Sequence, residues 1–481
     1  MGRNYEKDVF RHLQETLERV DCLTDEITTL RRETTRKIEA LETDICELKK
    51  ENKALKAENQ KLKDIINKNS GNSSKPPSSD GFVKIQNSRE KSGKKPGGQP
   101  GHNGKVHKLF DNPTHIEDIK AKKCKCGGNV KYTGNYKAKQ FVDAEFVTSI
   151  IEFREHEGIC ECCRKRVKNT APVNDIITYG NNIKSFAAML SLEGMVSINR
   201  IQQMICEFTG GWLNLSGGTI AKWNKDLSSL VAPSIEAIKE KLLISPVNHK
   251  DETGIRINKT LHWLHVLGNK THTLYYSHKK RGNEADKVMG VLPAYSGVLV
   301  HDHLKALYDF LCTHAECNAH ILRYLKAAIE KKKRVWAEDM IKLLLEAKMA
   351  VEGRDKPLHS ATVRKFHRRY DEILRQGREE FLQSESPDYN GEDMKLLRRM
   401  KKYKAEHLRF VSDPAVPFDN NQAERDLRMI KAKAKISGCF RADDGGMVFA
   451  ALKSYTSTLK KNGRNIFDGI KAAYAGTPVL C

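Results

Sequence analysis

The chain has 481 residues, with 84 Lys and Arg against 61 Asp and Glu, which gives a formal charge of +23. At roughly 100 to 200 residues per domain, this length predicts three or four units. No apolar run approaches the roughly 18 residues of a membrane span, and the charged start from Met1 to Arg11 argues against a signal peptide. We therefore expect a cytoplasmic protein, with no membrane partner, whose excess positive charge favours binding to a polyanion.

Residues 1–68 are predicted to form a helical rod that pairs as a coiled coil. The first 70 residues are neutral, with 15 basic and 15 acidic side chains, so the excess charge lies downstream. A seven-residue repeat runs through an a series, Ile38, Ile45, Asn52, Asn59 and Ile66, and a d series, Leu41, Leu48, Leu55 and Leu62. Asn at a positions favours a parallel dimer, so we expect a homodimer or a higher oligomer. A helix that packs on its own protein is the alternative.

Residues 69–110 are predicted to be a basic flexible linker. The segment is rich in Pro, Gly, Ser and Lys, and residues 71–110 contain eight Lys and Arg against two Asp and Glu. Such a composition cannot build a core. It suits contact with a DNA backbone, although solvated spacers commonly have the same composition.

Residues 111–175 are predicted to be a small zinc-binding module. Its candidate ligands are two pairs with short spacing, Cys124 with Cys126 and Cys160 with Cys163, and Cys162 competes with Cys163. Alternating apolar residues between 141 and 151 predict two short strands that would bring the pairs together. Four thiolates suit a structural Zn²⁺, which would stabilise a module too small for its own core. Reduced thiols without metal are the alternative.

Residues 176–245 are predicted to be a helical DNA-binding region. A turn at Gly210-Gly211 between two helical segments suggests a helix-turn-helix-like pair. A bundle of ordinary core helices explains the same pattern equally well.

After Pro246 the spacing of apolar residues in the sequence changes from a helical to an extended pattern. Three strands separated by short turns predict a meander, with Asp251 beside its first strand. A further buried strand, residues 297–301, ends on Asp302. Adjacent strands of one sheet could place Asp251 and Asp302 side by side.

A third carboxylate lies far downstream, in the stretch 418–431. Asp419 or Asn420 would cap a helix on which Glu424, Arg428 and Lys431 share one face. A carboxylate on that face could bind a metal while the cations hold phosphates. A surface ladder of ion pairs is the plainer alternative.

Residues 318–410 are predicted to be a helical insertion, because about 120 residues between Asp302 and Glu424 exceed a simple connection. Cys317 and His320 would share one helical turn, where such a pair more often supports packing than binds metal. After Glu424, Arg441 is a candidate for DNA contact, and the rest is expected to pack as helices.

Six pieces of sequence in this order resemble the insertion-sequence transposases of the family numbered sixty-six, of the DDE type. They are the heptad start, SSKPPSSD with KKPGGQPGHNG, the paired cysteines, DETG at 251–254, Cys-Asn-Ala-His at 317–320, and NNQAERDLR at 420–428. The resemblance implies an α/β fold with an RNase H-like catalytic core at 246–317 and 411–481, a mixed sheet with flanking helices. It also implies DNA transposition, with a catalytic triad of Asp251, Asp302 and Glu424 that binds Mg²⁺ or Mn²⁺.

The same resemblance implies that the protein binds DNA, both at the ends of the element and at the target. When bound to DNA, the protein is expected to be associated with the nucleoid. Arg425, Arg428, Lys431 and Arg441 are the candidate DNA contacts, and small accessory proteins of the element are possible partners. The family usually reads Asp-Gly-Tyr at the second carboxylate, whereas this chain has Asp302-His303-Leu304, so Asp309 is a second choice there. A nuclease that cuts without joining, and an inactive DNA-binding protein derived from a transposase, are the competing functions.

Overall fold

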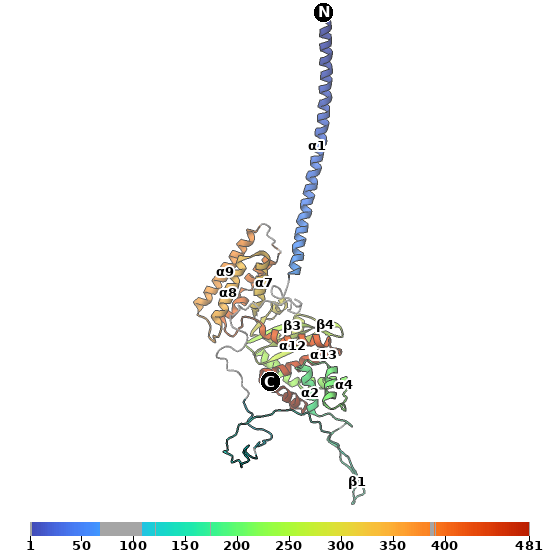
Figure 1. The fold of residues 1–481 in the computed structure, drawn as a ribbon, viewed down its shortest axis with the longest axis vertical. Helices are drawn as coiled ribbons and strands as arrows, with labels where there is room; N and C mark the ends of the chain where they lie inside the picture. The colour runs from blue at the N-terminus through green and yellow to red at the C-terminus, as the bar shows by residue number, and fades with distance from the viewer. Residues whose placement is uncertain are drawn as a thin grey trace. The chain divides into compact units, whose positions relative to one another are not determined.

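The computed structural model describes residues 2–67, 108–120, 122–173, 175–384, 389 and 391–480 (Figure 1). Two compact units divide the chain: Met1–Ile85 with Arg323–Arg334, and Gln86–Leu322 with Val335–Cys481. Most of the predicted linker, residues 68–107, lies outside the described residues.

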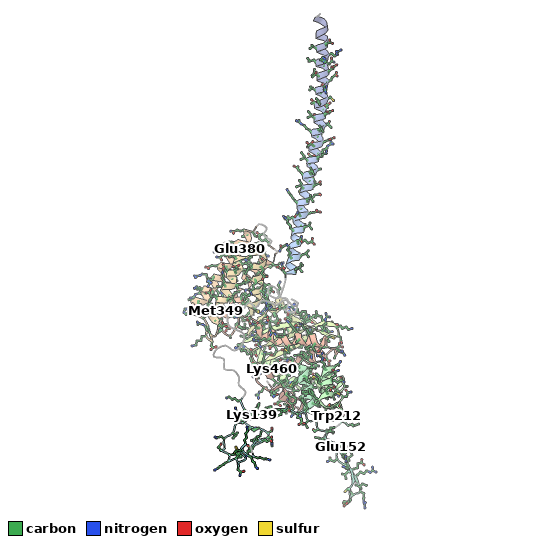
Figure 2. The ribbon with its side chains drawn as sticks, in the orientation of Figure 1. Lys139, Glu152, Trp212, Met349, Glu380 and Lys460 are labelled. Atoms are coloured by element: carbon green, nitrogen blue, oxygen red, sulfur yellow. The ribbon has the colours of Figure 1, made fainter. Side chains whose placement is uncertain are left out.

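The predicted rod is a single helix, α1 (Gly2–Ile66), of 65 residues. At about 1.5 Å per residue it is about 100 Å long. The apolar side chains of its seam are exposed, from 50% for Ile45 to 79% for Ile66, and Figure 2 shows side chains projecting along its length. A single helix does not bury such a seam, so this face of α1 is open to packing against another surface.

A five-stranded mixed sheet, in the order β5-β4-β3-β6-β7, forms the centre of the second unit. Its strands are β3 (Val247–Ile257), β4 (Thr260–Gly268), β5 (Thr273–His278), β6 (Val298–His301) and β7 (Thr313–Glu316). The predicted meander is confirmed, because β3, β4 and β5 pair antiparallel. Asn258 and Lys259 both have positive φ, 48° and 66°, as a two-residue hairpin turn requires. On the other side, β3, β6 and β7 run parallel.

Helices flank this sheet, and the mixed arrangement is the one expected of an RNase H-like core. Before the sheet come α2 (Asn181–Leu192), α3 (Ile198–Phe208), α4 (Gly217–Leu230) and α5 (Ala232–Leu243). Within it lie α6 (Asn283–Met289) and the 3-10 turns η2 (Leu292–Ala294) and η3 (Lys305–Asp309). After it come α7 (Asn318–Lys332), α8 (Val335–Val351), α9 (Ser360–Leu382), α10 (Glu392–Lys402), α11 (Lys404–Ser412), α12 (Asn421–Ser437), α13 (Gly445–Lys461) and α14 (Ile466–Tyr474).

The largest apolar core lies between the sheet and its last helices. Ile255 and Val266 of the strands pack there with Leu427 of α12 and Tyr455 of α13, and all four are buried. This core holds about twenty buried side chains, some of them from α2 and α4, and it fixes α12 against the face of β3. Among the described residues, no helix is both long and apolar enough to cross a membrane.

The cysteine-containing segment differs from its sequence prediction. The expected strands between residues 141 and 151 do not form, and that stretch carries no strand pairing. Instead a short hairpin, β1 (Glu157–Ile159) with β2 (Arg166–Lys168), surrounds the Cys160–Cys163 turn. Alternating apolar residues form a strand only where a neighbour supplies backbone hydrogen bonds, and none of the described segments does so here.

Candidate functional site

Candidate site residues on three parallel strands lie level with one another, one within β3 and two just beyond the ends of β6 and β7. His249 of β3 is in register with Val300 of β6, so Asp251 lies level with Asp302, two residues further along each chain. Val300 is in turn level with Ala315 of β7, which places Cys317 beside Asp302. A backbone hydrogen bond from Cys317 N to His301 O, 2.9 Å, continues this ladder. Asp251 and Asp302 therefore lie on adjacent strands, as the sequence predicted.

Asp251 and Asp302 repel each other electrostatically. Burial, and then the charges of Asp302 and Glu252, raise the pKa of Asp251 to about 7. The nearest lysine, Lys250, points to the opposite face of the strand, where its Nζ lies 3.2 Å from Asp286 and 3.0 Å from His265. Two neighbouring carboxylates, one of which raises the pKa of the other, fit a divalent metal ion, which prefers anionic oxygen ligands.

Helix α12 brings Glu424 to the same edge. His249 lies on the same face of β3 as Asp251, and its Nδ1 donates to Asn420 Oδ1 at 2.9 Å. Asn420 Nδ2 donates to Lys250 O at 2.8 Å, so this residue ties the start of α12 to β3. Glu424 follows one helical turn later, with its N–H 3.3 Å from Asn420 O. The predicted cap is divided between two residues: Asn420 holds the N-cap position, while Asp419 Oδ1 accepts the Asn421 N–H at 3.1 Å.

Cys317, His320 and Glu424 form a second group of possible metal ligands. Their ligand atoms all lie within 4.8 Å of one another, which places Glu424 beside Cys317 and thus near Asp302. Cys317 Sγ accepts the Asn420 N–H at 3.2 Å, and burial raises the pKa of this thiol to about 12. The sequence identified the Cys317–His320 pair, but only the tertiary fold reveals that Glu424 completes it.

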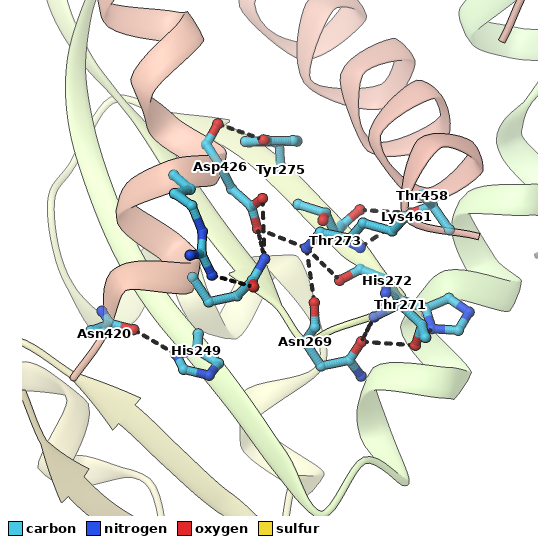
Figure 3. A network of polar contacts seen from close by, with 12 residues as sticks. His249, Asn269, Thr271, His272, Thr273, Tyr275, Asn420, Asp426, Thr458 and Lys461 are labelled. Carbon is cyan, nitrogen blue, oxygen red and sulfur yellow. Dashed lines mark hydrogen bonds and ion pairs between the residues drawn. The ribbon is translucent and has the colours of Figure 1, made fainter. Parts of the chain in front are cut away.

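A polar network fixes the other side of α12 to the sheet and to α13 (Figure 3). Asp426 Oδ2 lies 2.8 Å from Lys461 Nζ, and both side chains are mostly buried. Lys461 also donates to Asn269 O at 2.8 Å, and Tyr275 OH donates to Asp426 O at 2.8 Å. The sequence offered no signal for Lys461, because its partner is 35 residues away on another helix.

The family of the chain follows from comparison with known proteins. A family model described as the IS66 family of transposases matches residues 177–448, more than half of the chain. The chain belongs to the IS66 family of DDE transposases. A second model, described as a family of unknown function (DUF6444), matches residues 23–108. No curated protein matches.

The IS66 match contains the sheet, the insertion and the whole of α12, so membership implies that the protein takes part in DNA transposition. It also contains four cations proposed from the sequence as DNA contacts, and all are exposed: Arg425, Arg428 and Lys431 on α12, and Arg441 after it. Arg441 lines a cavity of about 750 Å³ together with Lys222 and Lys225 of α4. This places basic side chains from two distant segments around one opening.

The four predicted zinc ligands of this IS66 transposase lie in two tight turns. Cys124 N donates to Gly128 O at 2.9 Å, and Cys160 N donates to Lys165 O at 2.8 Å. Hydrogen bonds within each turn, from Cys126 in the first and from Cys163 and Cys162 in the second, lower the pKa of Cys124 and of Cys160. The described cysteines of the two turns do not come within 4.8 Å as one group of ligands.

Proposed function

We propose that this IS66 transposase cuts DNA at the ends of an insertion sequence and joins the exposed 3′-hydroxyl to target DNA. One observation supports this most: Asp251, within β3, lies level with Asp302, which follows the adjacent parallel strand β6, and the charge of Asp302 raises the pKa of Asp251. Glu424, at the first turn of α12, is the proposed third member of the triad. Strand order and parallel register of this kind suit an RNase H-like core.

The proposed chemistry is one phosphodiester hydrolysis followed by one transesterification. In the first step, water attacks the phosphorus at the element end, and the departing 3′-oxygen takes a proton to become a hydroxyl. In the second, that hydroxyl attacks a phosphorus of the target, whose own 3′-oxygen departs. Mg²⁺ or Mn²⁺ held by Asp251, Asp302 and Glu424 would activate the attacking oxygen and stabilise the leaving oxygen. No Ser or Tyr nucleophile is needed, because the attacking oxygen comes from water or DNA.

The exposed cations supply the proposed contacts with DNA. Arg425, Arg428 and Lys431 follow Glu424 along α12, so a phosphate beside the triad would meet positive charge on the same helix. Arg441 and the helices α2–α5 would extend this surface, which is the role that the sequence assigned to residues 176–245.

The deciding experiment is strand transfer of an oligonucleotide that carries the element's terminal repeat and a 3′-hydroxyl into plasmid DNA. With Mg²⁺ or Mn²⁺, wild type is expected to give joined product, and Glu424→Gln is expected to give none because a neutral amide binds the ion poorly. Glu372→Gln, exposed on α9, is the control and should join normally. Cleavage without joining would favour the nuclease. End binding with neither reaction would favour the DNA-binding protein or a requirement for accessory proteins.

We also propose that α1 assembles the transposase into parallel dimers through its exposed seam. Leu48→Asp, at a d position, is expected to convert the dimer to a monomer, since it places charge in the packed interface. Lys50→Asp, two residues away and outside the a and d positions, is the matched control. Light scattering after gel filtration measures the mass of both. A wild-type monomer at micromolar concentration would contradict the proposal.

The two cysteine turns are proposed to share one structural Zn²⁺. Purified protein is then expected to contain one zinc per chain, and Cys160→Ser to lose it, because removal of a thiolate opens the tetrahedral site. Cys22→Ser, at an exposed cysteine of α1, should keep the metal. Zinc that survives Cys160→Ser and disappears with Cys317→Ser would assign it to the other group of ligands.

A further inference from the structure

Glu316, the last residue of β7, has a buried carboxylate with four partners. Its side chain has no exposed surface. Oε1 accepts hydrogen bonds from His303 Nδ1 and from Tyr308 OH, the latter at 2.6 Å. Oε2 accepts from Arg399 at 2.8 Å and from His407 Nε2 at 3.0 Å. All the accepting directions of this carboxylate are used, so it does not serve as a metal ligand.

The two partners of Oε1 come from the loop that carries Asp302. His303 follows Asp302 directly, and Tyr308 lies in η3, in the middle of the same loop. His303 has a φ of 75°, a left-handed conformation that a residue with a side chain keeps only when its surroundings hold it. Its N–H also donates to His301 Nδ1 at 3.2 Å. Glu316 thus holds the Asp302 loop at its start, where the strained residue lies, and again at η3.

The two partners of Oε2 come from the helical insertion. Arg399 belongs to α10 and His407 to α11, and His407 Nδ1 lies 2.8 Å from Tyr370 OH of α9. Tyr403, between α10 and α11, covers the same loop, with its ring centroid 4.7 Å from that of His303 and 4.8 Å from that of Tyr308. The insertion therefore reaches the Asp302 loop through one shared carboxylate and one aromatic contact.

The same partners stabilise the ionised form of Glu316. Burial alone would raise the pKa of Glu316, but hydrogen bonds from His303 and His407 and the charge of Arg399 hold it well below its usual range. The carboxylate is therefore ionised at every working pH, as an acceptor of four hydrogen bonds must be. Neutralising it would leave buried cationic and polar partners unsatisfied.

We propose that Glu316 is a positioning residue that fixes the Asp302 loop for metal binding, and that the helical insertion acts on the reaction through it. This inference rests on the proposed function, since it concerns the second carboxylate of that triad. Glu316 does not touch the reacting atoms. It joins the loop of β6 on one side to α10 and α11 on the other, so docking of the insertion and the geometry of Asp302 are coupled.

Glu316→Gln and Arg399→Met test this coupling. Glu316→Gln keeps the size of the side chain but cannot accept four hydrogen bonds, and we expect Mn²⁺ affinity and kcat for strand transfer to fall about 10- to 100-fold. The dissociation constant for end DNA should stay unchanged. Arg399→Met removes one of the two contacts that the insertion makes with Glu316 and leaves the one from His407, so it should give a smaller loss in the same direction. Arg375→Met, which removes an exposed ion pair with Glu379, is the control from the same insertion.

Electron paramagnetic resonance of free Mn²⁺ measures the affinity of the protein for this ion. It therefore distinguishes a positioning role of Glu316 from a loss of folded protein. A merely structural role would lower the amount of active protein and leave the Mn²⁺ concentration for half-maximal binding unchanged. Folded Glu316→Gln with wild-type Mn²⁺ affinity and kcat would overturn the proposal. A wild-type protein that binds Mn²⁺ but neither cleaves nor joins DNA would instead contradict the proposed function, while the Mn²⁺ measurement on Glu316→Gln would still decide the positioning role.

Discussion

Asp302→Asn is expected to abolish both end cleavage and strand transfer, while the protein still binds end DNA. Residues that act as one catalytic unit lose most of the rate when any one is removed, so the expected loss is on the order of a thousandfold or more. Asn keeps the size of the side chain but lacks the charge that Asp302 places next to Asp251. Single-turnover rates of cleavage and of joining measure the effect, and gel shift with the same oligonucleotide measures binding.

Asp309→Asn is the matched control, because Asp309 was the second choice for this position of the triad. Asp309 is exposed and accepts a hydrogen bond from Asn283 Nδ2 at 2.6 Å, at the end of η3 rather than at the end of a strand. It is expected to react at close to the wild-type rate. Loss of activity in Asp309→Asn together with an active Asp302→Asn would show that the triad assignment is wrong.

The fold around the site could be predicted from sequence because each strand carries its own signal. Short apolar runs bounded by turn residues gave the meander, and Asn258-Lys259 indicated the hairpin. The same signal failed between residues 141 and 151, where apolar alternation is present but no strand pairing forms. Alternation reports which face of a chain is apolar, whereas a strand also requires a neighbouring chain in register.

The site itself was predictable only in part. Asp251 and Asp302 could be paired because the sequence assigns them to strands of one sheet, and the parallel register of β3 and β6 then places them level with each other. The residues that position the Asp302 loop could not be predicted from the sequence. Glu316 is a single glutamate in a short strand, and no periodic pattern around it marks it. Its partners come from residues 303 to 407, and such contacts depend on how the insertion docks rather than on local spacing.

Lys461→Met is expected to have the second large effect, a loss of folding stability. The substitution keeps the apolar stem of the side chain but leaves Asp426 as a mostly buried charge without its cation, and it removes the hydrogen bond to Asn269 O. Breaking such a pair by removing one partner costs about 3 kcal/mol. Urea unfolding followed by tryptophan fluorescence measures the loss. Because Asp426 lies two residues after Glu424, the activity of the remaining folded protein should fall as well.

Lys460→Met separates this effect from a general loss of positive charge on α13. Lys460 is 70% exposed and lies 3.6 Å from Glu193, so its pair is screened by water and contributes only about 0 to 1 kcal/mol. The two variants carry the same substitution at adjacent residues and differ in burial. If both unfold at the same urea concentration as wild type, the Asp426–Lys461 pair does not hold α12 on the sheet. A large loss for Lys461→Met alone would show that the buried Asp426–Lys461 pair stabilises the packing of α12, the helix that carries Glu424, on the sheet.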